Sequence, residues 1–202
     1  TMLGDRGDNT ASDTLTRLIL AEDKVVRLAA IGAATKLTGN RAVAPMLDRL
    51  RNGAEEDEIQ AIKGALLRIP GRQVVKACAH ALRDTPPPAR IALLDILKQR
   101  QADIARREVF AQAEAEDEAV RMAALDALLT VAKPADVDRV VDLAIEGRSD
   151  AEKDAARTVL LSLASERPAP LLSAIEQHDG QARADLLPVL PAIGSDAAYH
   201  AA

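Results

Sequence analysis

Aromatic residues are almost absent from this chain of 202 residues, which contains one Tyr, one Phe and no Trp. Compact globular cores usually draw on aromatic side chains for bulk, so a core of Ala, Leu, Val and Ile is expected instead. Such a core suits helices that pack closely side by side, and Ala and Leu are also the strongest helix formers. The composition therefore favours an all-helical fold.

Cysteine and long apolar runs are also scarce. Cys78 is the only cysteine, which excludes an internal disulfide. It shares a helical face with Val75 and Leu82, which predicts a buried, structural thiol. No run approaches the roughly 20 apolar residues that a membrane span needs, and no secretory signal is visible. The sequence therefore predicts no association with a membrane.

Motifs that carry chemistry are missing. The three histidines, His80, His178 and His200, are far apart, and none belongs to a pair with metal-ligand spacing. No serine stands in a nucleophile motif, and no phosphate-binding loop is present. The acidic run 55–58 is interpreted as complementing a helix N-terminus rather than binding a cation. We therefore predict no catalytic residue, no metal, no cofactor and no enzymatic activity.

One segment of the sequence occurs twice in similar form. AEDKVVRLAAIGA (21–33) and AEDEAVRMAALDA (115–127) match at eight of thirteen positions and begin 94 residues apart. This separation is three periods of about 31 residues, and stepping along the chain by that period reveals weaker intermediate copies. The position of the arginine in this repeated segment is called the slot below. In successive copies it is occupied by Arg27, Ile59, Arg90, Arg121, Lys153 and Arg183.

Each copy predicts a pair of helices, because apolar residues recur at helical spacing and no stretch alternates as a strand would. Gly7, Gly39 and Gly71 lie 32 residues apart and are expected to end the first helix of a pair. The first helices are expected near 23–37, 55–69, 88–100, 116–132, 150–165 and 181–192. The second helices are expected near 40–52, 71–84, 102–114, 135–147 and 167–178.

The pattern D-x-x-V-R-x-A-A-x-x-A, preceded by L-G-D-x-G-D and an apolar helix, resembles bacterial HEAT repeats. The resemblance extends to their short subtype named after phycocyanobilin lyases, and it covers essentially the whole chain. It implies an all-α fold, a right-handed α-solenoid (ARM/HEAT superhelix) of about five to six helix pairs. Residues 1–202 would then form a single array.

The repeated charges are interpreted as a stacking code. Asp23 and Asp117 stand where a first helix begins and are predicted to be N-caps. The resemblance further implies that matching Asp and Arg residues pair between neighbouring repeats, and Ile59 should interrupt this ladder. The predicted stacking residues are Asp23, Arg27, Arg90, Asp117, Arg121, Lys153 and Arg183.

Charge is distributed unevenly along the chain. Residues 1–110 carry 18 Lys and Arg against 14 Asp and Glu, whereas residues 111–202 carry 8 against 17. The resemblance implies that second helices line the concave side of a superhelix. Basic residues there form a candidate partner-binding surface, although a merely solvated helix face is the alternative interpretation. These residues are Arg41, Arg49, Arg72, Lys76, His80, Arg83, Arg106 and Arg107.

The leading hypothesis is a non-catalytic scaffold for protein–protein interaction. The alternatives are an accessory or lyase-type domain that binds a small anionic ligand on the concave face, and nucleic-acid binding through residues 41–107. A net charge of −5 and the scarcity of aromatic residues argue against nucleic acid. The residues do not identify the partner or the compartment.

Both ends of the sequence fall inside a repeat. TMLGDRGD contains Gly7, and AIGSDAAYHAA contains the corresponding Gly194. We therefore expect the chain to be a fragment of a longer array. Four apolar residues of the last full helix would then lack a covering helix and favour end-to-end self-association: Leu186, Leu187, Val189 and Leu190.

Overall fold

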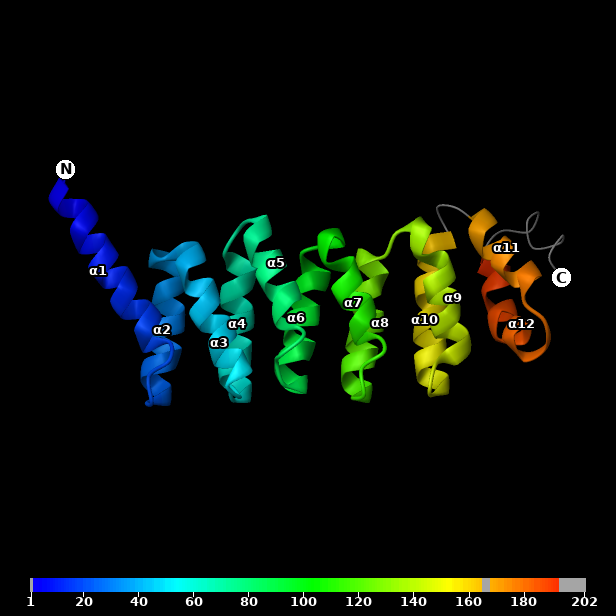
Figure 1. Cartoon of the computed structure of the whole chain (residues 1–202), viewed down its shortest axis with the longest axis horizontal. Coiled ribbons are helices and arrows are strands. Elements are labelled where there is room, and N and C mark those ends of the chain that lie inside the picture. Colours follow the sequence, from blue (N-terminus) through cyan, green and yellow to red (C-terminus); the bar gives the residue numbers. More distant parts are fainter. Residues whose placement is uncertain (1, 165–167, 193–202) are drawn as a thin grey trace. The chain divides into compact units, whose positions relative to one another are not determined.

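The protein is all-helical in the computed structural model, which describes residues 2–164 and 168–192, and the side chains of 10–164 and 168–190. Helices account for most of the described residues, which contain no strand. Twelve α-helices and four short 3₁₀-helices follow one another in the described part of the chain (Figure 1). The prediction of an all-α protein is confirmed.

The chain divides into two compact units, residues 1–108 and 109–202. This division coincides with the change in charge, because no charged residue lies between 108 and 111. The first unit is therefore basic and the second is acidic. The prediction that residues 1–202 form a single array stays a prediction.

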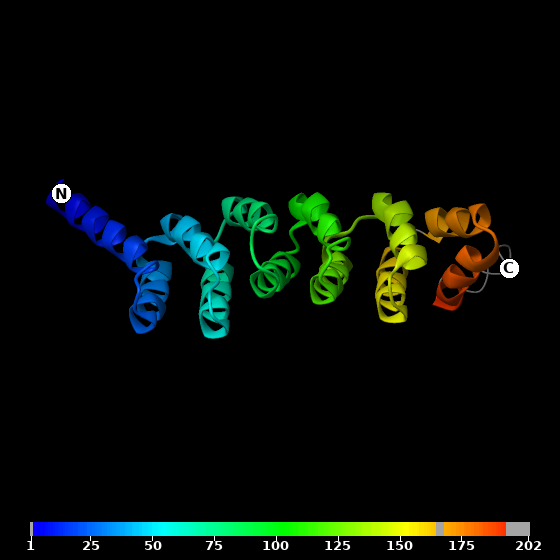
Figure 2. The same cartoon turned by 60° about the horizontal axis from the view of Figure 1, so that its bottom comes forward.

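In the first unit, successive first helices pack against one another. Helix α2 packs on α1 and α4, and α4 packs on α6, while the second helices α3 and α5 are also neighbours (Figures 1 and 2). The bounds are α1 (Met2–Leu18), α2 (Lys24–Leu37), α3 (Val43–Arg51), α4 (Glu56–Arg68), α5 (Arg72–Ala81) and α6 (Pro87–Gln99).

The second unit repeats this arrangement. Helix α10 packs on α8 and α9, and α9 also contacts α11 and α12. Helix α7 (Arg106–Gln112) begins before the boundary between the units. The remaining bounds are α8 (Glu118–Val131), α9 (Val137–Glu146), α10 (Asp150–Ala164), α11 (Pro168–Gln177) and α12 (Gly180–Leu186).

Every predicted first and second helix is present among the described residues. Three second helices begin with a 3₁₀ turn that the sequence pattern did not predict: η1 (Gly39–Ala42), η2 (Asp103–Ala105) and η3 (Pro134–Asp136). A fourth turn, η4 (Leu187–Ala192), extends α12. Gly39 and Gly71 adopt φ angles of 54° and 108°, as expected for glycines that turn the chain after a helix.

The predicted turn at Gly7 is wrong, because Gly7 lies inside the continuous helix α1. A glycine costs a helix interior only about 1 kcal/mol, so continuous helical hydrogen bonding over residues 2–18 outweighs it. The matching Gly194 lies outside the described residues. The expected exposed leucine face is also wrong in part, since Leu186, Val189 and Leu190 are buried and only Leu187 is exposed.

The core consists of small and aliphatic side chains, as the composition predicts. Phe110 is its one described aromatic side chain and is 1% exposed. The guanidinium of Arg139 lies 4.1 Å from the centre of the Phe110 ring, within the second unit. Cys78, Val75 and Leu82 are buried together on α5 or at its end, which confirms the predicted structural position of the thiol.

Candidate functional site

A buried ion pair joins the first helices of two neighbouring repeats in the first unit. The Nε atom of Arg27 in α2 donates to Oε1 of Glu58 in α4. The Nη1 atom of Arg27 donates to the carbonyl oxygens of Ala21 and Glu22, at 2.9 and 2.5 Å. Glu58 has no exposed surface. The pair therefore connects the turn before one first helix to the start of the next.

The second unit contains the same arrangement. Arg121 in α8 donates from Nε and Nη2 to Oε1 of Glu152 in α10, at 2.9 and 2.7 Å. Its Nη1 atom donates to the carbonyl oxygens of Ala115 and Glu116, at 2.8 and 2.6 Å. In both units the acid lies 31 residues after the arginine, and the carbonyls lie five and six residues before it. The repeated segment therefore forms the same contact in both units.

The acceptors are glutamates, which corrects the expectation that Asp and Arg would pair. Asp23 Oδ1 instead accepts the backbone N–H groups of Val25 and Val26, at 2.7 and 3.1 Å. Asp117 accepts the N–H of Val120 at 3.0 Å. Both aspartates are N-caps, as predicted, and their short side chains are committed to the helix ends.

The ion pairs change the acidity of the buried carboxyl groups. Burial by itself raises the pKa of Glu58, but hydrogen bonds from Arg49 and Arg27 outweigh burial and lower it to about 2. The hydrogen bond from Arg121 likewise lowers the pKa of Glu152. Both glutamates are therefore ionised at neutral pH and hold their arginines by charge-assisted hydrogen bonds.

The other slot positions differ in chemistry. Ile59 is buried and carries no charge, so the slot forms no ion pair there, but α4 and α6 are still joined by an ion pair between Lys63 and Asp95. Arg90 donates to the carbonyl oxygen of Thr85, at 3.0 Å from Nη2, and so closes the turn before its own helix. Lys153 donates to Asp185 Oδ2 at 2.8 Å, which links α10 to α12. Arg183 in α12 is half-buried.

Gly147 allows the chain to pass close to the start of α10, beside Glu152. A Cβ atom on Gly147 would lie 2.9 Å from Cγ of Lys153 and 3.1 Å from its backbone nitrogen. The backbone nitrogen cannot move without shifting the first turn of α10, and the carbonyl oxygen of Leu143 is equally close, at 3.1 Å. Close backbone approach therefore requires glycine at this position.

We predict that Gly147→Ala lowers the free energy of unfolding by about 1–3 kcal/mol, the usual cost of overpacking. Gly32→Ala is the matched control, because Gly32 lies inside α2 and a Cβ there meets no atom within 4 Å. That substitution should be neutral or stabilise by about 0.5–1 kcal/mol. Urea denaturation of both variants measures this, and equal midpoints would contradict it.

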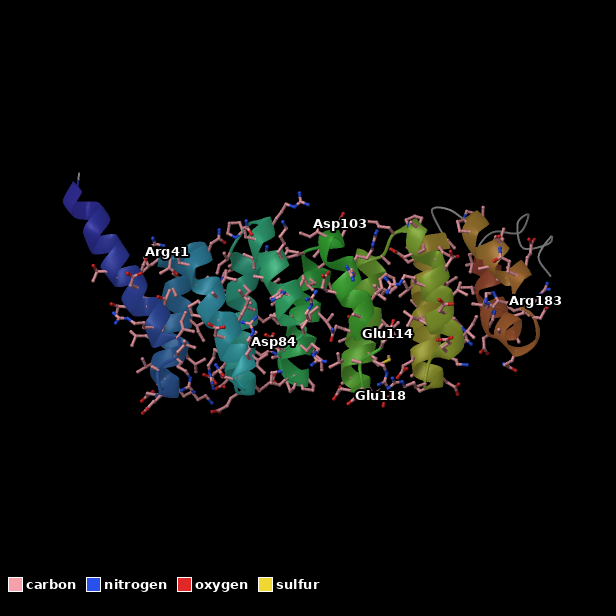
Figure 3. All side chains as sticks on the ribbon, in the orientation of Figure 1. Arg41, Asp84, Asp103, Glu114, Glu118 and Arg183 are labelled. Atoms are coloured by element: carbon pink, nitrogen blue, oxygen red, sulfur yellow. The ribbon has the colours of Figure 1, made fainter. Side chains whose placement is uncertain are left out.

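Most of the predicted partner-binding residues lie on the surface of the first unit. Arg41, Arg72, Lys76, His80, Arg83 and Arg107 are exposed, and Arg106 is half-buried. Figure 3 labels Arg41, at the start of the second helix that contains α3. Arg83 is 3.8 Å from Glu108. The structure thus places these basic residues on or beside successive second helices.

Arg49 is the exception. Its Nε atom donates to Glu58 Oε1 at 3.1 Å, and its Nη2 atom donates to Oε2 at 2.6 Å. Its side chain is 16% exposed. Arg49 therefore belongs to the buried ion pair, and sequence reasoning missed both this role and Glu58 as its acceptor. The signal was present, because Glu58 and Glu152 each directly precede a slot position.

Two grooves flank α5 in the first unit. The larger, about 350 Å³, lies between α3 and α5, and Val43, Leu47, Val74 and Ala77 make it mainly apolar. Asn40, Ala44, Arg51, Gln73 and His80 complete its lining. The smaller, about 200 Å³, is lined by Lys76, Ala79, His80, Ile104, Ala105 and Glu108. His80 borders both grooves, and Lys76 lines the smaller one.

The residues that chemistry would need are dispersed. No three His, Cys, Asp or Glu side chains come together as metal ligands within residues 10–164 and 168–190. Burial raises the pKa of the Cys78 thiol to about 12, so the thiol is not a nucleophile at neutral pH. His178 Nδ1 lies 2.6 Å from the carbonyl oxygen of Ala174 at the end of α11. His200 lies outside the described residues.

Among the described residues, each helix is too short or too polar to cross a membrane.

Neither a protein-family model nor a curated protein sequence matches this chain.

Proposed function

We propose that this protein is a non-catalytic HEAT-like α-solenoid that binds a protein partner through the basic surface of its first unit. Helix pairs that recur every 30–32 residues, joined by ion pairs at the same period, support the repeat architecture. Repeat arrays bury their apolar faces only by stacking and use extended surfaces for binding. The proposal includes a right-handed superhelix in which the second helices lie on the concave side.

The observation that carries the function is the apolar groove between α3 and α5. Val43, Leu47 and Ala77 give its lining an apolar character that suits an apolar side chain. Arg72 and Lys76 are exposed on the same helix α5, and Lys76 lines the second groove, of about 200 Å³. A partner segment with apolar anchors and acidic flanking residues fits this combination of shape and charge.

A small anionic ligand is the second candidate. The groove of about 200 Å³ that Lys76 and His80 line has a suitable size. Glu108 also lines this groove, however, and its carboxylate opposes an anion. We therefore place the protein partner first.

The test is affinity capture with the full chain, followed by mass spectrometry. We expect Arg72→Glu with Lys76→Glu to lose partner proteins that the wild type retains, by about tenfold or more, because two charges are reversed on α5, the helix between the two grooves. The control is Lys36→Glu with Arg68→Glu. This pair has the same charge change, and both residues are exposed on first helices and line neither groove.

Partners retained by the control and lost by the α5 variant support the proposal. Equal capture by both variants would overturn it. In parallel, we measure binding of a fluorescent DNA duplex and look for co-purified small molecules. Binding of either one by the wild type but not by the α5 variant would favour the corresponding alternative.

A further inference from the structure

The two buried glutamates differ in how many arginines they hold. Glu58 accepts from Arg27 and also, in bidentate fashion, from Arg49. Glu152 accepts from Arg121 through Oε1 and from the backbone N–H of Arg148 through Oε2, at 3.0 Å. The second unit thus has one arginine fewer on an otherwise equivalent carboxylate.

The missing arginine can be assigned to one position. Arg49 lies 22 residues after Arg27 and nine residues before Glu58. The residue with both of these spacings from Arg121 and Glu152 is Leu143. Arg49 and Leu143 are each the seventh residue of their helix, α3 and α9. An uncharged, half-buried side chain therefore stands where the first unit has a guanidinium.

A cavity of about 150 Å³ lies at this place in the second unit. An apolar cavity of similar volume holds benzene in another protein, and a guanidinium is smaller than benzene. Its lining includes Leu143, the paired Arg121 and Glu152, and the exposed residues Glu114, Glu146 and Arg148.

Two further carboxylates serve this cavity. Glu114 and Glu146 are both exposed and line it. Figure 3 shows Glu114 on the side of α8 that faces α9 and α10. Neither glutamate forms an ion pair within the described part of the chain. Arg148 also lines the cavity, but it is exposed and forms no ion pair with Glu152 there.

We propose that this cavity binds the guanidinium of an arginine presented by a partner protein. The arginine would contact Glu152 in the way that Arg49 contacts Glu58, with Glu114 and Glu146 adding charge at the mouth. Arg27 and Arg49 show that one carboxylate of this geometry accommodates two guanidinium groups. Arginine is favoured over lysine, because its planar fork matches a carboxylate with two parallel hydrogen bonds.

This site is in the second unit and does not depend on the proposed function of the basic surface. The experiment is an NMR titration of the full, isotope-labelled chain with two blocked tripeptides, Gly-Arg-Gly and Gly-Lys-Gly, and with methylguanidinium. We expect the arginine peptide to shift the backbone amides of residues 113–114 and 143–148. The lysine peptide should require at least about tenfold higher concentration, because it forms a single-point contact.

Leu143→Arg is the decisive variant, because its own guanidinium should fill the cavity and abolish these shifts. Glu146→Gln should weaken binding several-fold while leaving the fold unchanged, since Glu146 is exposed. Asp138→Asn is the control, because Asp138 is also exposed on α9 but does not line the cavity.

Four results would overturn the proposal. These are no shift in the wild type at millimolar peptide, equal shifts with the lysine peptide, undiminished binding by Leu143→Arg, and binding of methylguanidinium without the arginine peptide. The last result would show that a polypeptide cannot reach the cavity. None of these outcomes depends on whether the Arg72 and Lys76 variant loses partner capture, so the two proposals can fail separately.

Discussion

Glu58→Gln is expected to lower the free energy of unfolding by about 3–5 kcal/mol, the usual cost of removing one partner from a buried ion pair. The substitution would leave Arg27 and Arg49 facing a neutral amide. Their side chains are only 10% and 16% exposed, so water cannot fully solvate the two guanidinium groups once the carboxylate is gone. Urea denaturation followed by far-UV circular dichroism measures the loss.

Glu56→Gln is the matched control, because Glu56 is in the first turn of the same helix but exposed. Its effect should stay within about 0.5 kcal/mol, as for most surface substitutions. Similar losses for the two variants would show that the buried pairs do not stabilise the first unit.

The stability difference between wild type and Glu58→Gln should also depend on pH. The folded-state pKa of Glu58 is about 2, below its ordinary value of 4.5. A lowered carboxyl pKa stabilises the fold above the ordinary value, and this contribution is lost as the pH falls toward the folded-state value. The gap between the two proteins should therefore be constant near neutrality and narrow between about pH 4.5 and pH 2. A gap that widens on acidification would contradict the assignment.

Arg121→Ala is expected to destabilise the protein roughly three times as much as Arg148→Ala, or more, because buried charged hydrogen bonds contribute more than surface contacts. Arg121 makes four hydrogen bonds, two to Glu152 and two to backbone carbonyls. Arg148 is exposed, and its hydrogen bond to Glu152 comes from its backbone N–H, which an alanine would keep. Chemical denaturation of the two variants compares them directly, and coincident curves would contradict the argument.

The repeat pattern predicted the helices well, because each first helix carries its own apolar spacing and start signal. Asp23 and Asp117 could be recognised as N-caps because a cap acts on backbone groups two or three residues away. Gly7 could not be placed correctly, since the same residue type that ends one helix is tolerated inside another. The spacing of 32 residues between Gly7 and Gly39 gave no sign of that difference.

The contacts between repeats were harder to predict. Arg27 and Arg121 were identified as stacking residues, but the acceptors Glu58 and Glu152 lie 31 residues away. To identify these glutamates, rather than the N-cap aspartates, as the acceptors requires knowledge of how α4 and α10 are positioned. Arg49 belongs to the same predicted second helix, 40–52, as the exposed Arg41, and helical spacing alone did not separate its inward direction from that of Arg41. The cavity beside Leu143 depends on packing, which no single helix reveals.

The central claim is that the repeated arginine couples one repeat to the next through the glutamate 31 residues later. A double-mutant cycle at Arg121 and Glu152 tests it most directly, with Arg121→Met, Glu152→Gln and the double variant compared by urea denaturation. Contacting residues in one network are expected to be non-additive, so the double variant should be far more stable than the sum of the single losses predicts. Losses that add within about 0.3–0.5 kcal/mol, as they do for independent sites, would contradict the claim.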